Sequence, residues 1–257
     1  MKHVPNIFTL LNLIFGCFAI VFILQNGLVL QYNSEGSQVV EMPEKIVFAS
    51  LFIGLAAVVY FFDGFVARLF KATSELGKQL DSLADVVSFG VAPSMILFQF
   101  LRLSFAAEED GMNTSVLLLS PAFIIAACAA YRLAKFNLDD SQSFSFKGIP
   151  TPAVGLLLAS FPLIYWYTQY PLVYSILLNK WVLYTLILFL GMMMVSNVPM
   201  MSLKIKSKQA KENLPQILLI LIAGLSAILL HWLAVPIIFA AYILLSLLFK
   251  KQFSKFN

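Results

Sequence analysis

Residues 46–68 read IVFASLFIGLAAVVYFFDGFVAR, an apolar run in which Asp63 and Arg68 stand near one end. About 20 consecutive apolar residues are enough to cross the hydrocarbon core of a bilayer as an α-helix. The run therefore predicts a membrane-spanning helix. Asp63 lies one to two turns inside the end of that helix, where a carboxylate is not needed for spanning and requires its own explanation.

The composition of the whole chain extends this reading. Of the 257 residues, 60% are hydrophobic and 12% are charged, whereas soluble domains are about 45–50% apolar and about 25% charged. Disorder and an ordinary soluble domain are therefore excluded, and long unbroken runs exclude an outer-membrane β-barrel. We expect an all-α, polytopic membrane bundle of about eight transmembrane helices, from apolar segments at residues 7–31, 46–68, 82–104, 115–136, 152–170, 180–201, 214–231 and 233–249.

The basic residues predict the orientation of this bundle. Of the 17 Lys and Arg residues, 14 fall at the N-terminus or at the segment ends and loops near residues 68–80, 132–147, 204–212 and 250–257. By the positive-inside rule this side is cytoplasmic, so both termini are cytoplasmic and the number of spans is even. Eight spans satisfy this condition, and six would satisfy it as well. We expect a multi-pass protein of the inner (cytoplasmic) membrane. The basic run Lys204, Lys206, Lys208 and Lys211 is interpreted as a loop that contacts anionic membrane lipids, and no nucleic-acid partner is expected.

An acidic cluster lies between residues 60 and 85. Asp81 and Asp85 are four residues apart and share one face of the third predicted helix. A short polar loop, Leu69 to Gln79, separates that helix from the one that carries Asp63, so the two helices are expected to be antiparallel neighbours. Asp63, Asp81 and Asp85 can then converge in a cleft at the cytoplasmic interface.

Three carboxylates at this depth indicate function. Each costs roughly 2.5–3.5 kcal/mol to insert near hydrocarbon, and together they repel one another. A bound divalent cation removes that repulsion, and oxygen ligands suit Mg²⁺ or Mn²⁺. Gly64 leaves room for a ligand to approach the backbone, and Arg68 can pair with a phosphate. The alternative is an ordinary ion pair between Asp63 and Arg68, with Asp81 merely near a helix N-terminus.

The same stretch resembles the signature of the CDP-alcohol phosphatidyltransferase family, D-x2-D-G-x2-A-R-x8-G-x3-D-x3-D. Seven of its eight defined positions are present at the required spacing: Asp63, Gly64, Ala67, Arg68, Gly77, Asp81 and Asp85. Tyr60 takes the place of the first aspartate. Within the family, the chain is most similar to the bacterial phosphatidylserine synthase branch, through residues 4–13 (VPNIFTLLNL), 80–93 (LDSLADVVSFGVAP), 131–137 (YRLAKFN), 146–153 (FKGIPTPA) and 194–199 (MVSNVP).

The resemblance implies a domain organisation and a chemistry. Residues 1–201 would form the membrane core with the six helices of the family, and residues 202–257 a basic cytoplasmic loop followed by a C-terminal helical hairpin. The reaction would transfer a phosphatidyl group from CDP-diacylglycerol to the hydroxyl of L-serine and release CMP, in phospholipid biosynthesis. Homodimerisation is expected by analogy with the family.

The resemblance also implies roles for individual residues. Asp63 and Asp81 would bind a first Mg²⁺ or Mn²⁺ ion, and Asp81 and Asp85 a second. Asp85 would also accept the proton of the incoming hydroxyl. Gly64, Arg68 and Ser74 would contact the CDP-lipid. Arg132 is the candidate for a second phosphate contact or for the carboxylate of serine, with a positive-inside anchor as the alternative.

Tyr60 changes what is expected of the metal site. It stands three residues before Asp63 and so faces the same cleft. A phenol is a poor ligand for a hard cation at neutral pH, and its ring can fill the metal position. We hypothesise that the chain binds metal weakly and turns over slowly or not at all.

Three other functions remain open. The acceptor could be another alcohol, such as glycerol 3-phosphate or inositol phosphate, because the signature itself does not choose the alcohol. The chain could be a CDP-lipid binder without catalysis. It could also be a secondary transporter that uses its intramembrane acids for ion coupling, although no inverted repeat is visible.

Overall fold

Long apolar helices make up most of the chain, and the computed structural model describes them over residues 4–32, 38–69, 74–106, 108, 111–138, 146–202 and 213–250. The helices are α1 (Val4–Gln25), α2 (Val47–Leu69), α3 (Glu75–Asp85), α4 (Ala92–Ala106), α5 (Val116–Leu119), α6 (Ile124–Leu138), α7 (Thr151–Tyr167), α8 (Pro171–Leu177), α9 (Lys180–Val195), α10 (Leu214–Leu230) and α11 (Ala234–Leu248). A π-helix, η2 (Val86–Val91), joins α3 to α4. The expected all-α, polytopic membrane class is confirmed.

Short elements connect these helices. Single 3-10 turns are η1 (Glu44–Ile46), η3 (Gly111–Asn113), η4 (Ser120–Phe123) and η5 (His231–Leu233). The described strands form two antiparallel pairs, β1 (Val29–Tyr32) with β2 (Gln38–Glu41) and β3 (Phe146–Lys147) with β4 (Pro199–Met200).

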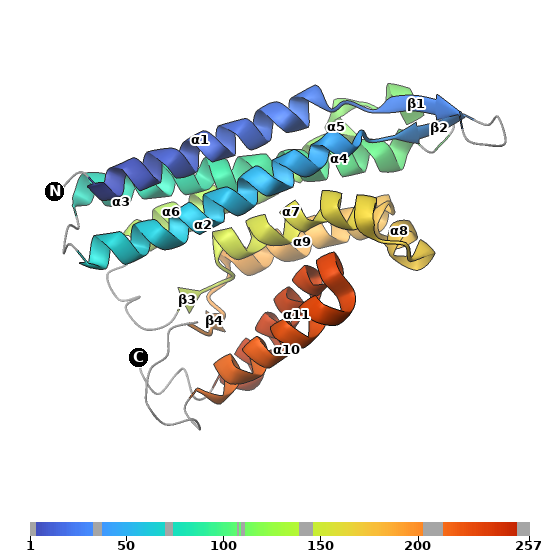
Figure 1. Cartoon of the computed structure of the whole chain (residues 1–257). Coiled ribbons are helices and arrows are strands. Elements are labelled where there is room, and N and C mark those ends of the chain that lie inside the picture. Colours follow the sequence, from blue (N-terminus) through green and yellow to red (C-terminus); the bar gives the residue numbers. More distant parts are fainter. Residues whose placement is uncertain are drawn as a thin grey trace.

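The number of spans is smaller when counted by helix length. Among the described residues, five helical stretches are long and apolar enough to cross a membrane, and six if α8 and α9, which are bent by 64°, form one broken span. One of the five is Leu214–Leu248, but the chain folds back at His231, which has a φ of 49°. As a result α10 and α11 lie side by side (Figure 1). Each predicted apolar segment overlaps at least one helix, whereas the total of eight spans stays a prediction.

Two helix boundaries and one short helix differ from the sequence prediction. The first predicted segment runs to residue 31, but α1 ends at Gln25, because Val29–Tyr32 pairs with β2 instead. The predicted polar loop from Leu69 to Gln79 is shorter, since α3 begins at Glu75. Ser74 caps that helix by accepting a hydrogen bond of 3.0 Å from the Gly77 N–H, which is a favourable helix start. The short helix α8 was not expected.

The continuous helix α3–η2–α4 forms the centre of the bundle. Two-thirds (67%) of its most apolar window is buried, against 28–33% for α1, α2 and the α5–α6 stretch. Its fully buried side chains include Phe89, Ile96 and Phe100. Within η2 the Ala92 N–H bonds to the carbonyl of Val87, five residues back, as in a π-helix.

Three helices pack closely against η2 at glycines. A Cβ atom on Gly16 of α1 would lie 2.4 Å from Ser88 Oγ, and one on Gly155 of α7 would lie 2.9 Å from Phe89 Cβ. A Cβ on Gly90 of η2 itself would lie 3.0 Å from the Cβ of Ala129 on α6. The π-helix is therefore held in place from three sides.

One end of the bundle gathers the segments of interest. Helices α1, α3, α7 and α10 begin at this end (Figure 1). Helices α2, α6, α9 and α11 end there. The β3–β4 pair lies at the same end, and the β1–β2 hairpin lies at the opposite end. We call it the signature end, because α2 and α3 carry Asp63, Asp81 and Asp85 there. Its placement in the cytoplasm rests on the charge distribution and stays a prediction.

Candidate active site

Two of the signature carboxylates are held by side chains of α1. Thr9 Oγ1 donates a hydrogen bond of 2.6 Å to Asp63 Oδ2, and Asn12 Nδ2 donates one of 3.0 Å to Asp85 Oδ1. Asp63 is 8% exposed and Asp85 is 2% exposed. Hydrogen bonds from neutral donors to carboxylates are charge-assisted and strong. Helix α1 therefore forms one wall of the site.

Asp81 completes the carboxylate set. It precedes Asp85 by one turn on α3 and interacts electrostatically with both Asp63 and Asp85. Each of the α1 hydrogen bonds occupies one oxygen of its carboxylate and leaves the other oxygen for a ligand. The structure thus brings the three predicted carboxylates from α2 and α3 into one region.

The carboxylate oxygens fit a hard divalent cation by their chemistry. Nevertheless, within the described part of the chain no three Asp, Glu, His or Cys side chains are close enough to form a ready-made metal group. The residues present therefore supply the right donor atoms. The three carboxylates are not close enough together to coordinate one ion as they stand.

Tyr60 lies in the same region, three residues before Asp63 on α2. Its ring packs edge-on against Phe89 of η2, with 5.8 Å between the ring centroids. It interacts electrostatically with all three aspartates and with Arg132. About a third of its surface (36%) remains exposed, so the ring is only partly enclosed by the bundle.

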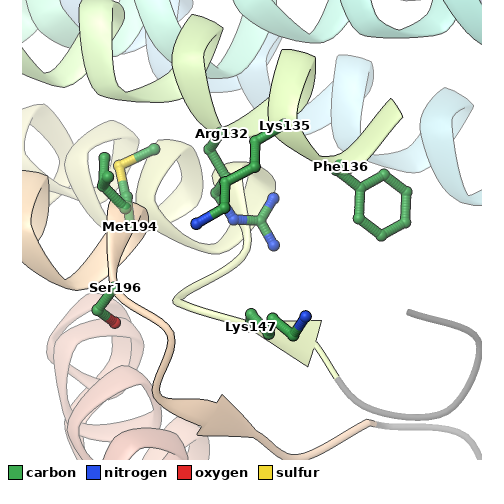
Figure 2. A pocket seen from close by; sticks show the side chains of 7 residues that line it. Arg132, Lys135, Phe136, Lys147, Met194 and Ser196 are labelled. Carbon is green, nitrogen blue, oxygen red and sulfur yellow. The ribbon is translucent and has the colours of Figure 1, made fainter. Parts of the chain in front are cut away.

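Arg132 comes from α6 and is buried, with 8% exposure. Its Nη1 donates a long hydrogen bond of 3.5 Å to Thr151 Oγ1, while its Nε–H has no acceptor among the described residues. The guanidinium interacts electrostatically with Asp85. Figure 2 shows it beside Lys135 of α6 and above Lys147 of β3.

These basic side chains line a very small cavity at the signature end. Its volume is about 10 Å³, which is room for about one water molecule. The residues that line it are Arg132, Lys135, Phe136, Lys147, Met194, Val195 and Ser196 (Figure 2).

The backbone around this cavity is fixed by a close turn. Gly148 has a φ of 72°, and a Cβ atom there would lie 2.5 Å from the carbonyl oxygen of Met194. The Gly148 N–H bonds to the Val198 carbonyl at 2.9 Å, and Lys135 Nζ donates to Asn197 Oδ1 at 3.0 Å. The stretches 131–137, 146–153 and 194–199, which are far apart in sequence, therefore meet at one place.

The other predicted site residues, Ser74, Gly64 and Arg68, lie on or next to helices α2 and α3. Ser74 caps α3. Gly64 is exposed on α2, and a Cβ atom there would meet nothing within 4 Å. The backbone of Arg68 belongs to the last turn of α2, but its side chain lies outside the described residues. The basic loop from Lys204 to Lys211 also lies outside them.

Thr9 and Asn12 were not predicted as site residues. A signal was present, because Asn6, Thr9 and Asn12 recur every three residues in an otherwise apolar N-terminal helix. Such spacing places polar side chains on one helix face. It gives no indication of which other helices they contact.

Comparison with known proteins now decides the family. The family model described as CDP-alcohol phosphatidyltransferase matches residues 2–195, which is most of the chain. The matched range includes the three aspartates, Tyr60 and Arg132. The chain belongs to the CDP-alcohol phosphatidyltransferase family. It is therefore an enzyme of phosphatidyl transfer, as the signature predicted.

Three relatives of the chain carry the same name. The chain is 33% identical over 231 residues to the CDP-diacylglycerol–serine O-phosphatidyltransferase of Helicobacter pylori, covering 85% of this chain and 78% of the relative. It is 33% identical over 160 residues to the protein of that name in Bacillus subtilis, covering 62% and 74%. The protein of that name in Methanocaldococcus jannaschii is 33% identical over 190 residues, covering 74% and 69%.

Proposed function

We propose that this enzyme transfers the phosphatidyl group of CDP-diacylglycerol to the hydroxyl of L-serine, forming phosphatidylserine and CMP. The observation that supports the proposal is that Asp63, Asp81 and Asp85 interact electrostatically with one another at one end of a membrane bundle. The choice of serine is supported by the names of the relatives, which are CDP-diacylglycerol–serine O-phosphatidyltransferases.

The proposed reaction gives Asp85 a specific task. Its carboxylate takes the proton of the serine hydroxyl as general base. The serine oxygen then bonds to the phosphorus that carries diacylglycerol, while the bond from that phosphorus to the CMP oxygen breaks and its electron pair leaves with CMP. Asn12 is bonded to one Asp85 oxygen, so the other oxygen is the one available for the proton.

Asp63, Asp81 and Asp85 would hold Mg²⁺ or Mn²⁺, with two ions expected from the family. A divalent cation bound there would draw charge from the pyrophosphate and stabilise the leaving CMP. The α1 donors bond to one oxygen of Asp63 and to one of Asp85, so the second oxygen of each carboxylate would be the one to hold the ion.

Other residues are proposed to bind the substrates. Arg132 is buried, interacts electrostatically with Asp85, and has an Nε–H without an acceptor in the described part of the chain. This environment suits a phosphate or carboxylate ligand better than a surface anchor. A Cβ atom at Gly64 would meet nothing within 4 Å, which suits the approach of the nucleotide. Ser74 accepts the capping bond through its oxygen and would donate its hydroxyl hydrogen to the CDP-lipid. Arg68 is proposed as a phosphate contact from its place in the signature.

We also propose that the signature end faces the cytoplasm and that the enzyme resides in the inner (cytoplasmic) membrane. The lipid tails can then stay in the bilayer while the nucleotide and serine arrive from the cytoplasm. The division at residues 201 and 202 and the homodimer stay predictions.

The test is CMP release from CDP-diacylglycerol in detergent micelles, with and without L-serine and with Mn²⁺ or Mg²⁺. Serine-dependent CMP release, together with labelled phosphatidylserine from labelled serine, is the expected result. CMP release with glycerol 3-phosphate or inositol phosphate instead would keep the chemistry and replace the acceptor. Solute uptake into liposomes without any CMP release would indicate a transporter.

A second candidate function is binding of a CDP-lipid without catalysis, and Tyr60 specifically supports it. Its ring stands beside the three aspartates where the signature has an aspartate. Such a binder would retain CDP-diacylglycerol in an equilibrium binding assay and release no CMP with any alcohol.

A further inference from the structure

Helix α1 contacts two different catalytic elements with two neighbouring side chains. Thr9 and Asn12 are three residues apart and lie on one face of α1, where side chains of this spacing are about 5–6 Å apart. Thr9 reaches Asp63 on α2, and Asn12 reaches Asp85 on α3. We propose that Thr9 and Asn12 are positioning residues that set the separation and orientation of these two carboxylates. The proposal rests on the proposed function of the site.

The side chains of Thr9 and Asn12 are buried, and the backbone that carries them is fixed. Thr9 is 2% exposed and Asn12 is 1% exposed. The backbone of α1 is tied to η2 directly at this point, because Ser88 Oγ donates a hydrogen bond of 2.9 Å to the Asn12 carbonyl. One turn further on, Gly16 allows the backbones of α1 and η2 to approach closely. A shift of α1 would therefore move both carboxylate bonds together.

The bonding of Asn12 argues against a purely structural role. Its Nδ2 is used by Asp85, but its buried Oδ1 has no donor among the described residues. An unsatisfied buried acceptor costs about 1–3 kcal/mol, so an apolar residue would serve packing better. The amide is explained if its task is to hold Asp85.

Two carboxylates that repel one another need such support before a cation arrives. Without the donors on α1, the side chains of Asp63 and Asp85 would rotate apart to reduce repulsion. Hydrogen-bond partners of metal-binding side chains typically contribute 10–100-fold to metal affinity or activity. The same range is expected for Thr9 and Asn12.

The test compares Thr9→Val and Asn12→Leu, which keep similar shape and remove the donor, with two controls. Thr9→Ser keeps the hydroxyl, and Ser160→Ala removes a buried hydroxyl that bonds to Leu157 within α7. Three quantities are measured on the purified full chain and on the chain carrying Tyr60→Asp: Mn²⁺ binding by electron paramagnetic resonance without substrate, kcat and KM for CDP-diacylglycerol, and the melting temperature.

Thr9→Val and Asn12→Leu are expected to weaken Mn²⁺ binding and lower kcat by about 10–100-fold with little change in KM or melting temperature. Both controls should match their parent. The proposal is overturned if the two variants bind Mn²⁺ like the parent, if their losses follow the melting temperature, or if Thr9→Ser loses as much as Thr9→Val. It is also overturned if neither parent binds Mn²⁺. A parent that binds Mn²⁺ but releases no CMP with serine would contradict the proposed function alone, since the binding comparison still decides the role of α1.

Discussion

Among single residues, Tyr60 has the largest expected effect on activity. Its ring stands beside the three aspartates and contacts Phe89. Replacing it with aspartate restores an oxygen ligand at the first signature position. Tyr60→Asp is expected to raise serine-dependent CMP release by about tenfold or more at limiting Mn²⁺, since ligand-shell changes act on this scale.

Tyr60→Phe is the matched control, because it keeps the ring and removes only the hydroxyl. It should leave the rate at that of the parent chain. Equal rates for the parent and for Tyr60→Asp would mean that the first aspartate is dispensable in this enzyme.

Gly64 gives a second prediction at this scale. Because a Cβ atom at Gly64 meets no protein atom within 4 Å, Gly64→Ala should fold normally. Its methyl group would instead meet the bound nucleotide, and KM for CDP-diacylglycerol should rise about tenfold, equivalent to about 1.4 kcal/mol of binding. Steady-state kinetics at varied CDP-diacylglycerol measure this effect.

Gly54 supplies the control on the same helix, since a Cβ atom there also meets nothing within 4 Å. Gly54→Ala should change neither KM nor kcat. If both alanine variants behave alike, Gly64 has no special relation to the substrate.

The site could be predicted from the sequence only where its residues are close in the chain. The spacing of Asp81 and Asp85 places them on one helix face, and a short loop brings Asp63 near them. Thr9 is 54 residues from Asp63, and Asn12 is 73 residues from Asp85. No local pattern specifies contacts over such separations, so these two residues emerged only from the packing of α1.

At the scale of elements, the contact between α1 and η2 is the most sensitive. A methyl group on Gly16 would lie 2.4 Å from Ser88 Oγ and 2.9 Å from Ser88 Cα, which is backbone and cannot turn away. Gly16→Ala is therefore expected to destabilise the protein by about 1–3 kcal/mol, as overpacking usually does. A lower melting temperature in detergent is the measured result.

Gly224→Ala on α10 is the comparison, because its Cβ would meet nothing within 4 Å. Alanine there should leave the melting temperature unchanged or raise it, given the better helix propensity of alanine. Equal melting temperatures for the two variants would show that α1 can move away from η2 without loss.

The helices themselves were largely predictable, because long apolar runs are sufficient to locate them. Their ends were less so. Whether Val29–Tyr32 continues a helix or forms a strand depends on its partner Gln38–Glu41, and the start of α3 depends on the Ser74 cap. The π-helix had no sequence signal, since it depends on how η2 is held by its neighbours.

For the whole molecule, the charge distribution predicts that the signature end faces the cytoplasm. Cysteine labelling in cells tests this after Cys17 and Cys128 are replaced by serine. Leu138 at the end of α6 is 87% exposed, and Tyr170 at the opposite end is 58% exposed. Tyr170→Cys should react with a membrane-impermeant maleimide in intact cells, whereas Leu138→Cys should react only after permeabilisation. The reverse pattern would invert the orientation.

The π-helix η2 determines which insertions and deletions the continuous helix α3–η2–α4 can tolerate during evolution. A π-helix contains one residue more than an α-helix that turns through about the same angle, so η2 takes up an extra residue without rotating α3 relative to α4. Each residue of an α-helix turns the chain by about 100°. Deleting a single residue within Val86–Val91 would thus allow η2 to become an α-helix and keep Asp81 and Asp85 directed toward α1, whereas a deletion within Ala92–Ala106 would rotate them by about 100° relative to the part of the helix that follows. The π-helix is therefore a place where this helix can lose one residue without changing the direction in which the chemistry faces.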